Sequence, residues 1–262
     1  MFANERYDII AELLRERRSV TVSELMERFG VSIETVRRDL AFLEKQGKLM
    51  RVHGGAVDVS GKKYELPALS ARLDENTDKK RSLSRAAASL VREGDVIALD
   101  AGSTTSELAY VLCERFKKLT IITYSRDIID IITENSEFDV ISLGGRYMKS
   151  EHLFCGHIAE ENLRRLHADL AFVAPSSISI RCGAMISLSE VYSIMHGFLD
   201  ISDRRYLVAD STKFETTLPV RLCSLTEVDA ILTDSTLSPS LRALYAAQNI
   251  RIITEDSSSE QQ

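Results

Sequence analysis

Seven short apolar runs alternate with stretches of helical periodicity in the C-terminal three-fifths of the chain. The runs cover residues 96–99, 119–123, 138–143, 170–174, 206–209, 230–233 and 251–254. Helical patterns cover residues 105–116, 126–135, 158–166, 188–199 and 239–248. Strands that alternate with helices predict βαβ units, whose right-handed crossovers place helices on both faces of a sheet. We therefore expect an α/β domain with a mostly parallel sheet over residues 79–255.

The first 57 residues have a different pattern, in which three helical stretches precede a short basic hairpin. Ser32 is the expected N-cap of the third helix, because its hydroxyl can accept a hydrogen bond from the first turn. Apolar residues follow it at helical spacing and predict an inward face. Two short strands, 49–52 and 56–57, come next. This order is typical of a winged helix-turn-helix domain that binds DNA.

A recognition helix places its N-terminal residues at base edges in the major groove. The residues expected to contact DNA are Ser32, Thr35, Arg37 and Arg38 on the helix, and Arg51 and His53 on the wing. An arginine binds a guanine edge or a phosphate, and the spacing does not decide which of these Arg37 and Arg38 contact. The alternative is a small helical bundle with a solvated arginine pair.

Charge is unevenly spread along the chain. Residues 1–57 hold 10 Lys and Arg against 9 Asp and Glu, whereas the remainder holds 23 against 30. An acidic body repels DNA phosphates, so we expect DNA contacts to come from the N-terminal domain and to be strongly salt-dependent. The overall balance argues against a general nucleic-acid coat protein.

Two polar segments complete the predicted domain organisation. Residues 58–78 include Pro67, which breaks a long helix, and predict a linker between the DNA-binding domain (1–57) and the α/β domain. Residues 256–262 are expected to be a disordered tail.

The four cysteines are isolated, without a CxxC pair, which suits a reducing cytosol and suggests neither a metal site nor a disulfide framework. No apolar run approaches the ~18 residues of a membrane span, and the first residues contain no apolar signal region. We expect a cytoplasmic protein without a cofactor, a bound metal or a membrane partner.

The run Asp-Ala-Gly-Ser-Thr-Thr-Ser at residues 100–106 follows a predicted buried strand and opens a helix. Gly102 lets the backbone approach a ligand, and the N–H groups at the start of the helix then face the same point. This predicts an anion cradle suited to phosphate. It is not a P-loop, because the GxxxxGK[ST] pattern is absent. The alternative is a simple strand–turn–helix cap.

Polar residues also follow four other predicted strands, and ligands bind beyond the carboxyl ends of strands in open α/β sheets. The residues expected to bind an effector are Asp100, Gly102, Ser103, Thr104, Thr105, Thr123, Ser125, Gly144, Gly145, Ser176, Asp210 and Lys213. Lys213 adds a positive charge for a phosphate. Asp100 and Asp210 can accept hydrogen bonds from sugar hydroxyls.

Several of these motifs occur together in one known family. They are Arg6-x3-Ile10-x3-Leu14, Val-Ser-x2-Thr-Val-Arg-Arg-Asp-Leu at 31–40, Arg-x-His-Gly-Gly-Ala at 51–56, Asp-Ala-Gly-Ser-Thr-Thr at 100–105, Asp-Ser-Thr-Lys-Phe at 210–214 and Asp-Ala-Ile-Leu-Thr-Asp at 229–234. From residue 6 to residue 254 the chain resembles the DeoR family of bacterial transcriptional regulators. The resemblance implies an effector domain related to sugar-phosphate isomerases and coenzyme A transferases, which in this family senses a phosphorylated sugar or related metabolite and usually does no catalysis.

Three positions depart from the family pattern. Tyr124 stands where relatives have Asn, Pro175 lies in a segment that is usually rich in Gly, and His196 lies roughly where many relatives carry Lys or Arg. We expect Tyr124 to narrow the pocket and Pro175 to stiffen its rim. A histidine at 196 would weaken a fixed positive charge near neutral pH.

The sequence therefore predicts a sequence-specific repressor of a carbohydrate or sugar-alcohol catabolic operon. Its expected partners are double-stranded operator DNA, a phosphorylated sugar or sugar-alcohol effector, and further copies of itself in a homodimer or homotetramer. One alternative is a sugar-phosphate isomerase fused to a DNA-binding module, with Asp100, Asp210 and Lys213 as its acid and base groups. Another is a regulator whose pocket is vestigial.

Overall fold

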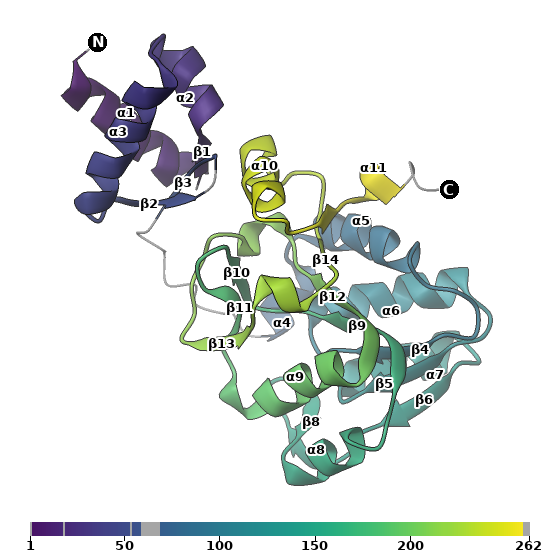
Figure 1. Ribbon diagram of the computed structural model, residues 1–262. Helices are drawn as coiled ribbons and strands as arrows, with labels where there is room; N and C mark the ends of the chain where they lie inside the picture. The colour runs from purple at the N-terminus through teal and green to yellow at the C-terminus, as the bar shows by residue number, and fades with distance from the viewer. Residues whose placement is uncertain (1, 18, 53, 59–68, 259–262) are drawn as a thin grey trace.

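The computed structural model describes residues 2–17, 19–52, 54–58 and 69–258. A small N-terminal domain lies at one end of a larger α/β body (Figure 1). The predicted wing residue His53, most of the first half of the predicted linker and the end of the predicted tail lie outside the described residues.

The N-terminal domain has three helices and a three-stranded antiparallel sheet. The helices are α1 (Ala3–Arg17), α2 (Val22–Phe29) and α3 (Ile33–Lys45). The sheet has the order β1-β3-β2, with β1 at Ser19–Thr21, β2 at Leu49–Val52 and β3 at Gly55–Asp58. Buried apolar side chains from all three helices, such as Ile10, Leu25 and Leu40, form its core. The predicted helix-turn-helix with its wing is confirmed.

Two hydroxyl caps begin the helices of the helix-turn-helix. Thr21 Oγ1 accepts a hydrogen bond from the backbone N–H of Glu24 at the start of α2, over 3.1 Å. Ser32 Oγ accepts one from the backbone N–H of Thr35 at the start of α3, over 3.3 Å. Each cap satisfies an N–H group that lacks a partner within its helix. The predicted N-cap role of Ser32 is therefore confirmed.

The wing can form only because position 55 is a glycine. β3 lies between β1 and β2, and Gly55 pairs with Thr21. A Cβ atom at Gly55 would lie 2.1 Å from the carbonyl oxygen of Val20. A backbone atom cannot move aside as a flexible side chain can, so this close approach of two strands requires glycine.

An ion pair buried in the N-terminal domain joins α1 to α3. The guanidinium of Arg6 donates to both carboxylate oxygens of Asp39, over 2.6 Å and 3.1 Å. The side chains are 11% and 5% exposed, respectively. The paired carboxylate raises the pKa of Arg6. The geometry is bidentate, so the pair fixes the angle between the two helices as well as their separation.

All seven predicted strands form one parallel sheet in the body. They are β4 (Val96–Leu99), β5 (Thr120–Thr123), β6 (Asp139–Ser142), β9 (Ala168–Val173), β12 (Ser202–Val208), β14 (Ala230–Leu232) and β15 (Ile252–Ile253). Their order is β15-β14-β12-β9-β4-β5-β6, and every neighbouring pair is parallel. The α/β class and the mostly parallel sheet are confirmed.

Helices cover both faces of this sheet. On one face lie α5 (Thr77–Ala88), α6 (Ser103–Arg115) and α7 (Arg126–Asn135). On the other lie α8 (His157–Leu163), α9 (Tyr192–Asp200) and α10 (Pro239–Ala247). Along β4, Ile97 and Leu99 pack on the first face and Ala98 on the second, as the two-residue period of a strand requires.

The structure also contains elements that the sequence pattern did not predict. They are the β-hairpin of β7 (Arg146–Met148) and β8 (Leu153–Cys155), the small sheet of β10 (Ser177–Ser179), β11 (Gly183–Ile186) and β13 (Val220–Cys223), the 3-10 helices η2 (Ser211–Lys213) and η3 (Leu225–Glu227), and the short helix α11 (Glu255–Ser258). The predicted helix 188–199 begins as the 3-10 helix η1 (Ser189–Val191) and continues as α9. Within the predicted linker lies α4 (Leu69–Asp74), and α5 begins at Thr77. Leu69 is buried, so the second half of the predicted linker packs on the body.

Candidate functional site

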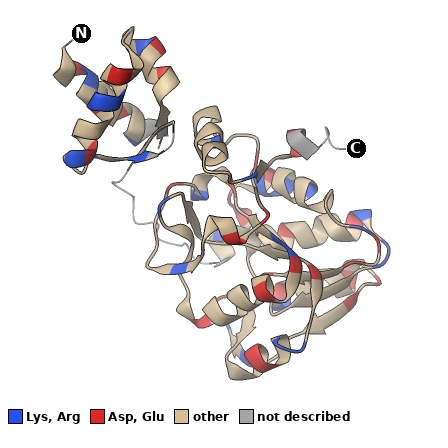
Figure 2. Ribbon diagram, viewed as in Figure 1, with Lys and Arg blue, Asp and Glu red and all other residues tan. Residues whose placement is uncertain are grey.

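The predicted DNA-reading residues of the helix lie at the start of α3. The hydroxyls of Ser32 and Thr35 are 3.0 Å apart and take part in the N-terminal cap. Arg37 and Arg38 are exposed, and Arg37 makes only a loose pair, 3.9 Å long, with Glu34. Basic residues mark α3 and β2 in the ribbon (Figure 2). The exposed guanidinium groups are therefore placed to reach a phosphate or a base edge.

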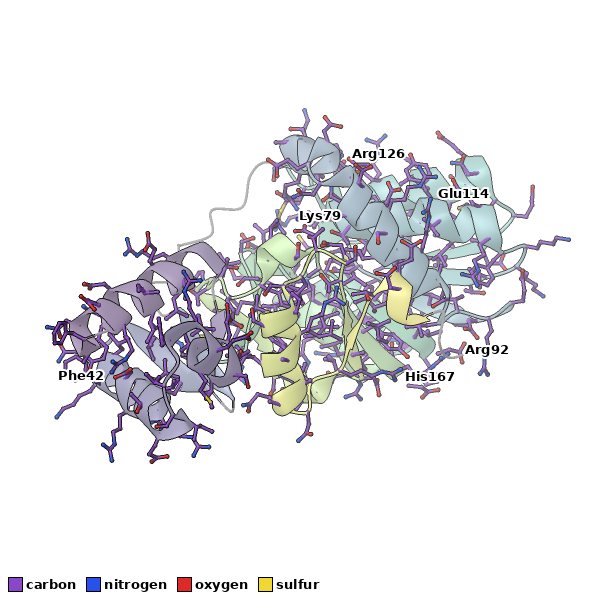
Figure 3. The ribbon with its side chains drawn as sticks, turned by 90° about the horizontal axis from the view of Figure 1, so that it is seen from above. Phe42, Lys79, Arg92, Glu114, Arg126 and His167 are labelled. Carbon is purple, nitrogen blue, oxygen red and sulfur yellow. The ribbon has the colours of Figure 1, made fainter. Side chains whose placement is uncertain are left out.

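Arg51 connects the wing to the recognition helix. Its guanidinium lies 3.2 Å from Glu44 of α3, whose other carboxylate oxygen accepts the backbone N–H of Arg51 over 2.8 Å. Arg37 and Arg51 also line a groove to which Ile180 and Arg181 of the body contribute. Phe42, further along α3, lies on the side of the N-terminal domain that faces away from the body (Figure 3).

A second site lies at the N-terminus of α6. Gly102 is the N-cap residue, with φ of 147°, and supplies no side chain to the first turn. Ser103 and Thr104 open the helix and line a pocket that Ser176 and Lys213 also line. The first-turn N–H groups of an uncapped helix attract anions through their partial positive charge. The structure thus brings five of the predicted effector residues together around one pocket.

Asp100 lies beneath this pocket and does not face it. Its carboxylate accepts hydrogen bonds from the Tyr124 hydroxyl, from Ala101 N over 2.8 Å and from Ala174 N over 2.8 Å. Burial raises the pKa of Asp100 to about 6, although all three donors act to lower it. Tyr124 itself lines the pocket. The Tyr124 hydroxyl therefore binds the carboxylate that was expected to accept hydrogen bonds from sugar hydroxyls, and the carboxylate itself does not line the pocket.

The other predicted effector residues do not line this pocket, and each has a local structural contact. Thr105 Oγ1 donates to Gly102 O, Thr123 Oγ1 accepts the N–H of Ser125, Ser125 Oγ caps α7, Gly144 N donates to Ser142 Oγ, and Asp210 caps η2. Gly145 has φ of 107°, and a Cβ atom there would lie 2.8 Å from Cys155 O. Thr123, Ser125 and Asp210 are buried.

The three departures from the family pattern lie in different places. Tyr124 and Pro175 both line the pocket, whereas their expected effects on its width and on the stiffness of its rim stay predictions. His196 is not among the described lining residues. Its Nδ1 lies 3.1 Å from Asp200 on the same helix, and its ring lies against that of Tyr192.

Sequence reasoning missed an ion pair and an apolar wall in this pocket. Arg72 of α4 pairs with Glu151, and both line the pocket. The apolar residues of the wall are Leu153, Ile186, Leu188, Val191 and Met195. These residues come from separate segments, namely the predicted linker, the unpredicted hairpin, β11 and the predicted helix 188–199, which the structure forms as η1 and α9. Only the tertiary fold brings them together.

The described part of the chain contains no cluster of three or more His, Cys, Asp or Glu side chains that could hold a metal ion. None of its helices is long and apolar enough to cross a membrane.

Comparison with known proteins matches both parts of the chain to family models. Residues 6–61 match the DeoR-like helix-turn-helix domain, and residues 75–235 match the DeoR C terminal sensor domain. The chain is 32% identical to the transcriptional repressor AccR of Agrobacterium fabrum, over 94% of this chain and 97% of the relative. It is 31% identical to the lactose phosphotransferase system repressor of Lactococcus lactis, over 91% and 94%.

Another relative is named as an activator and not as a repressor. It is the L-fucose operon activator of Haemophilus influenzae, which is 32% identical over 95% of this chain and 99% of the relative. Among solved structures, ribose 5-phosphate isomerase from Methanocaldococcus jannaschii is similar with a TM-score of 0.40 and 16% identity, over 55% of this chain and 57% of that chain. This structural likeness is weak, and no function follows from it.

Proposed function

Because the chain belongs to the DeoR family of DNA-binding transcriptional regulators, we propose that it represses a carbohydrate or sugar-alcohol catabolic operon under the control of a phosphorylated sugar. The observation that carries the effector half of this proposal is the pocket at α6. There an uncapped helix N-terminus, Lys213 and Arg72 face the same space. These groups favour an anion, and the phosphate of a phosphorylated sugar is such an anion.

The DNA-binding half rests on α3 and the wing. Arg37 and Arg38 lie exposed on α3, and Arg51 lies on β2 next to it. A single helix-turn-helix makes few contacts, so we propose a homodimer or homotetramer that binds paired half-sites. Two relatives carry the word repressor in their names, and one of these names refers to a lactose phosphotransferase system.

DNA selectivity can be tested with a pool of random duplexes. Selection by the full chain should enrich one palindromic motif, and an anisotropy titration should give tighter binding to that motif than to scrambled DNA. Binding to the motif should weaken steeply with salt, because phosphate contacts release counterions. Equal binding to every duplex would contradict the proposal.

Effector binding can be tested by thermal-shift screening of pentose, hexose and sugar-alcohol phosphates. A ligand at 100 times its dissociation constant adds about 2.7 kcal/mol to the free energy of unfolding. Thr104→Glu places a carboxylate at the start of α6 and should remove this stabilisation while DNA binding persists. If no compound stabilises the wild-type chain, the pocket is vestigial.

The isomerase alternative requires an acid and a base that reach the substrate. The carboxylate of Asp100 binds the Tyr124 hydroxyl and does not line the pocket, and Asp210 is buried and caps η2. We propose on these grounds that the chain is not an enzyme. Turnover of any pentose or hexose phosphate by the purified protein would overturn this part of the proposal.

A further inference from the structure

The pocket at α6 contains a charge pair that joins two distant segments. Arg72 belongs to α4, whereas Glu151 lies in the turn between β7 and β8. Their side chains are only 13% and 16% exposed, respectively. Both line the same pocket as Ser103, Thr104 and Lys213.

A phosphorylated ligand in this pocket would approach Arg72, whose guanidinium is already paired with the carboxylate of Glu151. Among the described lining residues, Glu151 alone carries a carboxylate, beside the cations of Arg72 and Lys213. A guanidinium binds a phosphate in the same forked way as it binds a carboxylate. Glu151 and a ligand phosphate therefore compete for Arg72, and the like charges of the two anions oppose simultaneous binding.

The helix that carries Arg72 is the first described helix after the N-terminal domain. Leu69 is buried, and Lys80 of α5 donates to the carbonyl oxygens of Arg72 and Leu73 over 2.5 Å and 3.1 Å. These contacts hold α4 on the body irrespective of what the guanidinium binds. The pair with Glu151 is the contact of α4 that a ligand would exchange.

On the basis of the proposed function, we infer that Arg72 is an effector-binding residue and that Glu151 is the counter-ion that holds it when the pocket is empty. Ligand binding then replaces the contact between Arg72 and Glu151. This contact belongs to α4, the first described helix after the DNA-binding domain in the sequence. An effector alters an equilibrium only through such differences in contacts between two states.

The test measures the binding of inorganic phosphate by thermal shift in the full chain and in two variants. Arg72→Gln removes the cation and should weaken phosphate binding by about tenfold, which equals about 1.4 kcal/mol. Glu151→Gln removes the competitor and should tighten phosphate binding. A tighter complex cannot result from misfolding, so this second variant keeps the inference testable if Arg72→Gln folds poorly.

A matched control uses an exposed ion pair between α5 and α6. Arg81 Nη2 lies 3.2 Å from Glu114, and neither residue lines the pocket. Arg81→Gln and Glu114→Gln should leave the phosphate affinity unchanged. If phosphate binds the wild-type chain but both pocket variants weaken it or neither changes it, the pair is only structural and the inference is overturned. If the wild-type chain binds no phosphate at all, the inference and the proposed effector site fail together.

Discussion

Replacing Tyr124 by Phe removes one hydrogen-bond donor from a buried carboxylate and leaves the ring in place. Burial raises the pKa of Asp100 from 3.8 to about 6. The folded chain thus binds this proton more tightly than the unfolded chain, and the free energy of unfolding falls as the pH rises through this interval. At 1.36 kcal/mol per pKa unit, the ionised carboxylate costs the fold about 3 kcal/mol above pH 6.

The Tyr124 hydroxyl lowers the pKa of Asp100, so its loss should raise that pKa above 6. A hydrogen bond to a charged group contributes about 1.5–3 kcal/mol, and one between neutral groups about 1 kcal/mol. Tyr124→Phe should therefore destabilise the protein by about 1.5–3 kcal/mol near pH 8, where Asp100 is ionised. Near pH 5, where Asp100 is protonated, the loss should be about 1 kcal/mol.

The assay is urea unfolding of both proteins at the two pH values, followed by circular dichroism. Tyr206→Phe is a matched control, because Tyr206 is also a buried tyrosine and its hydroxyl makes no hydrogen bond within the described residues. The control should give the same small loss at both pH values. An equal loss at both pH values for Tyr124→Phe would refute the argument that this hydroxyl stabilises the ionised form of Asp100.

Three other substitutions test the N-terminal domain. Arg38→Ala should weaken operator binding by about 1–3 kcal/mol if the side chain contacts a base, and should weaken binding to all duplexes alike if it contacts only phosphate. Anisotropy titrations with operator and scrambled DNA distinguish these two outcomes. Asp39→Ala leaves the guanidinium of Arg6 buried without its carboxylate and should cost about 3–5 kcal/mol in urea unfolding, whereas an effect below about 1 kcal/mol would mean that the pair behaves as an exposed one. Gly55→Ala places a Cβ atom 2.1 Å from Val20 O, so the wing should not form and DNA binding should be lost; unchanged binding would show that β1 and β3 can separate.

Periodicity predicted the central sheet because each buried strand is a short apolar run. All seven runs became strands of the parallel sheet, and their ends shifted by only a few residues. The cap at Ser32 was likewise visible, since it depends on neighbours three residues away. Local rules succeed where the interacting atoms are close in sequence.

The pocket could be predicted only in part, because its walls come from distant segments. The start of α6 has a local signature, and Ser103 and Thr104 do line the pocket. The sequence cannot show that the Tyr124 hydroxyl binds Asp100, since the two residues lie on different strand ends. Nor can it show that Arg72 reaches Glu151 from 79 positions away. A polar residue at a strand end marks the edge of the sheet where a pocket can form, whereas the packing of distant segments decides which side chains line that pocket.

The segments that line the pocket continue into the groove beside the recognition helix. The Ser177 hydroxyl donates to the carbonyl of Thr216, which joins the start of β10, next to Ser176, to the loop after Lys213.

In that loop, buried Glu215 accepts the N–H of Ile180 over 3.1 Å and the Tyr245 hydroxyl of α10 over 2.7 Å. Ile180 in turn lines the groove with Arg37 and Arg51. The pocket and the groove thus share one hydrogen-bonded unit. Breaking one of the buried polar contacts of this unit would cost about 1–3 kcal/mol in desolvation, so the contacts hold the loop after Lys213 against the segment that lines the groove.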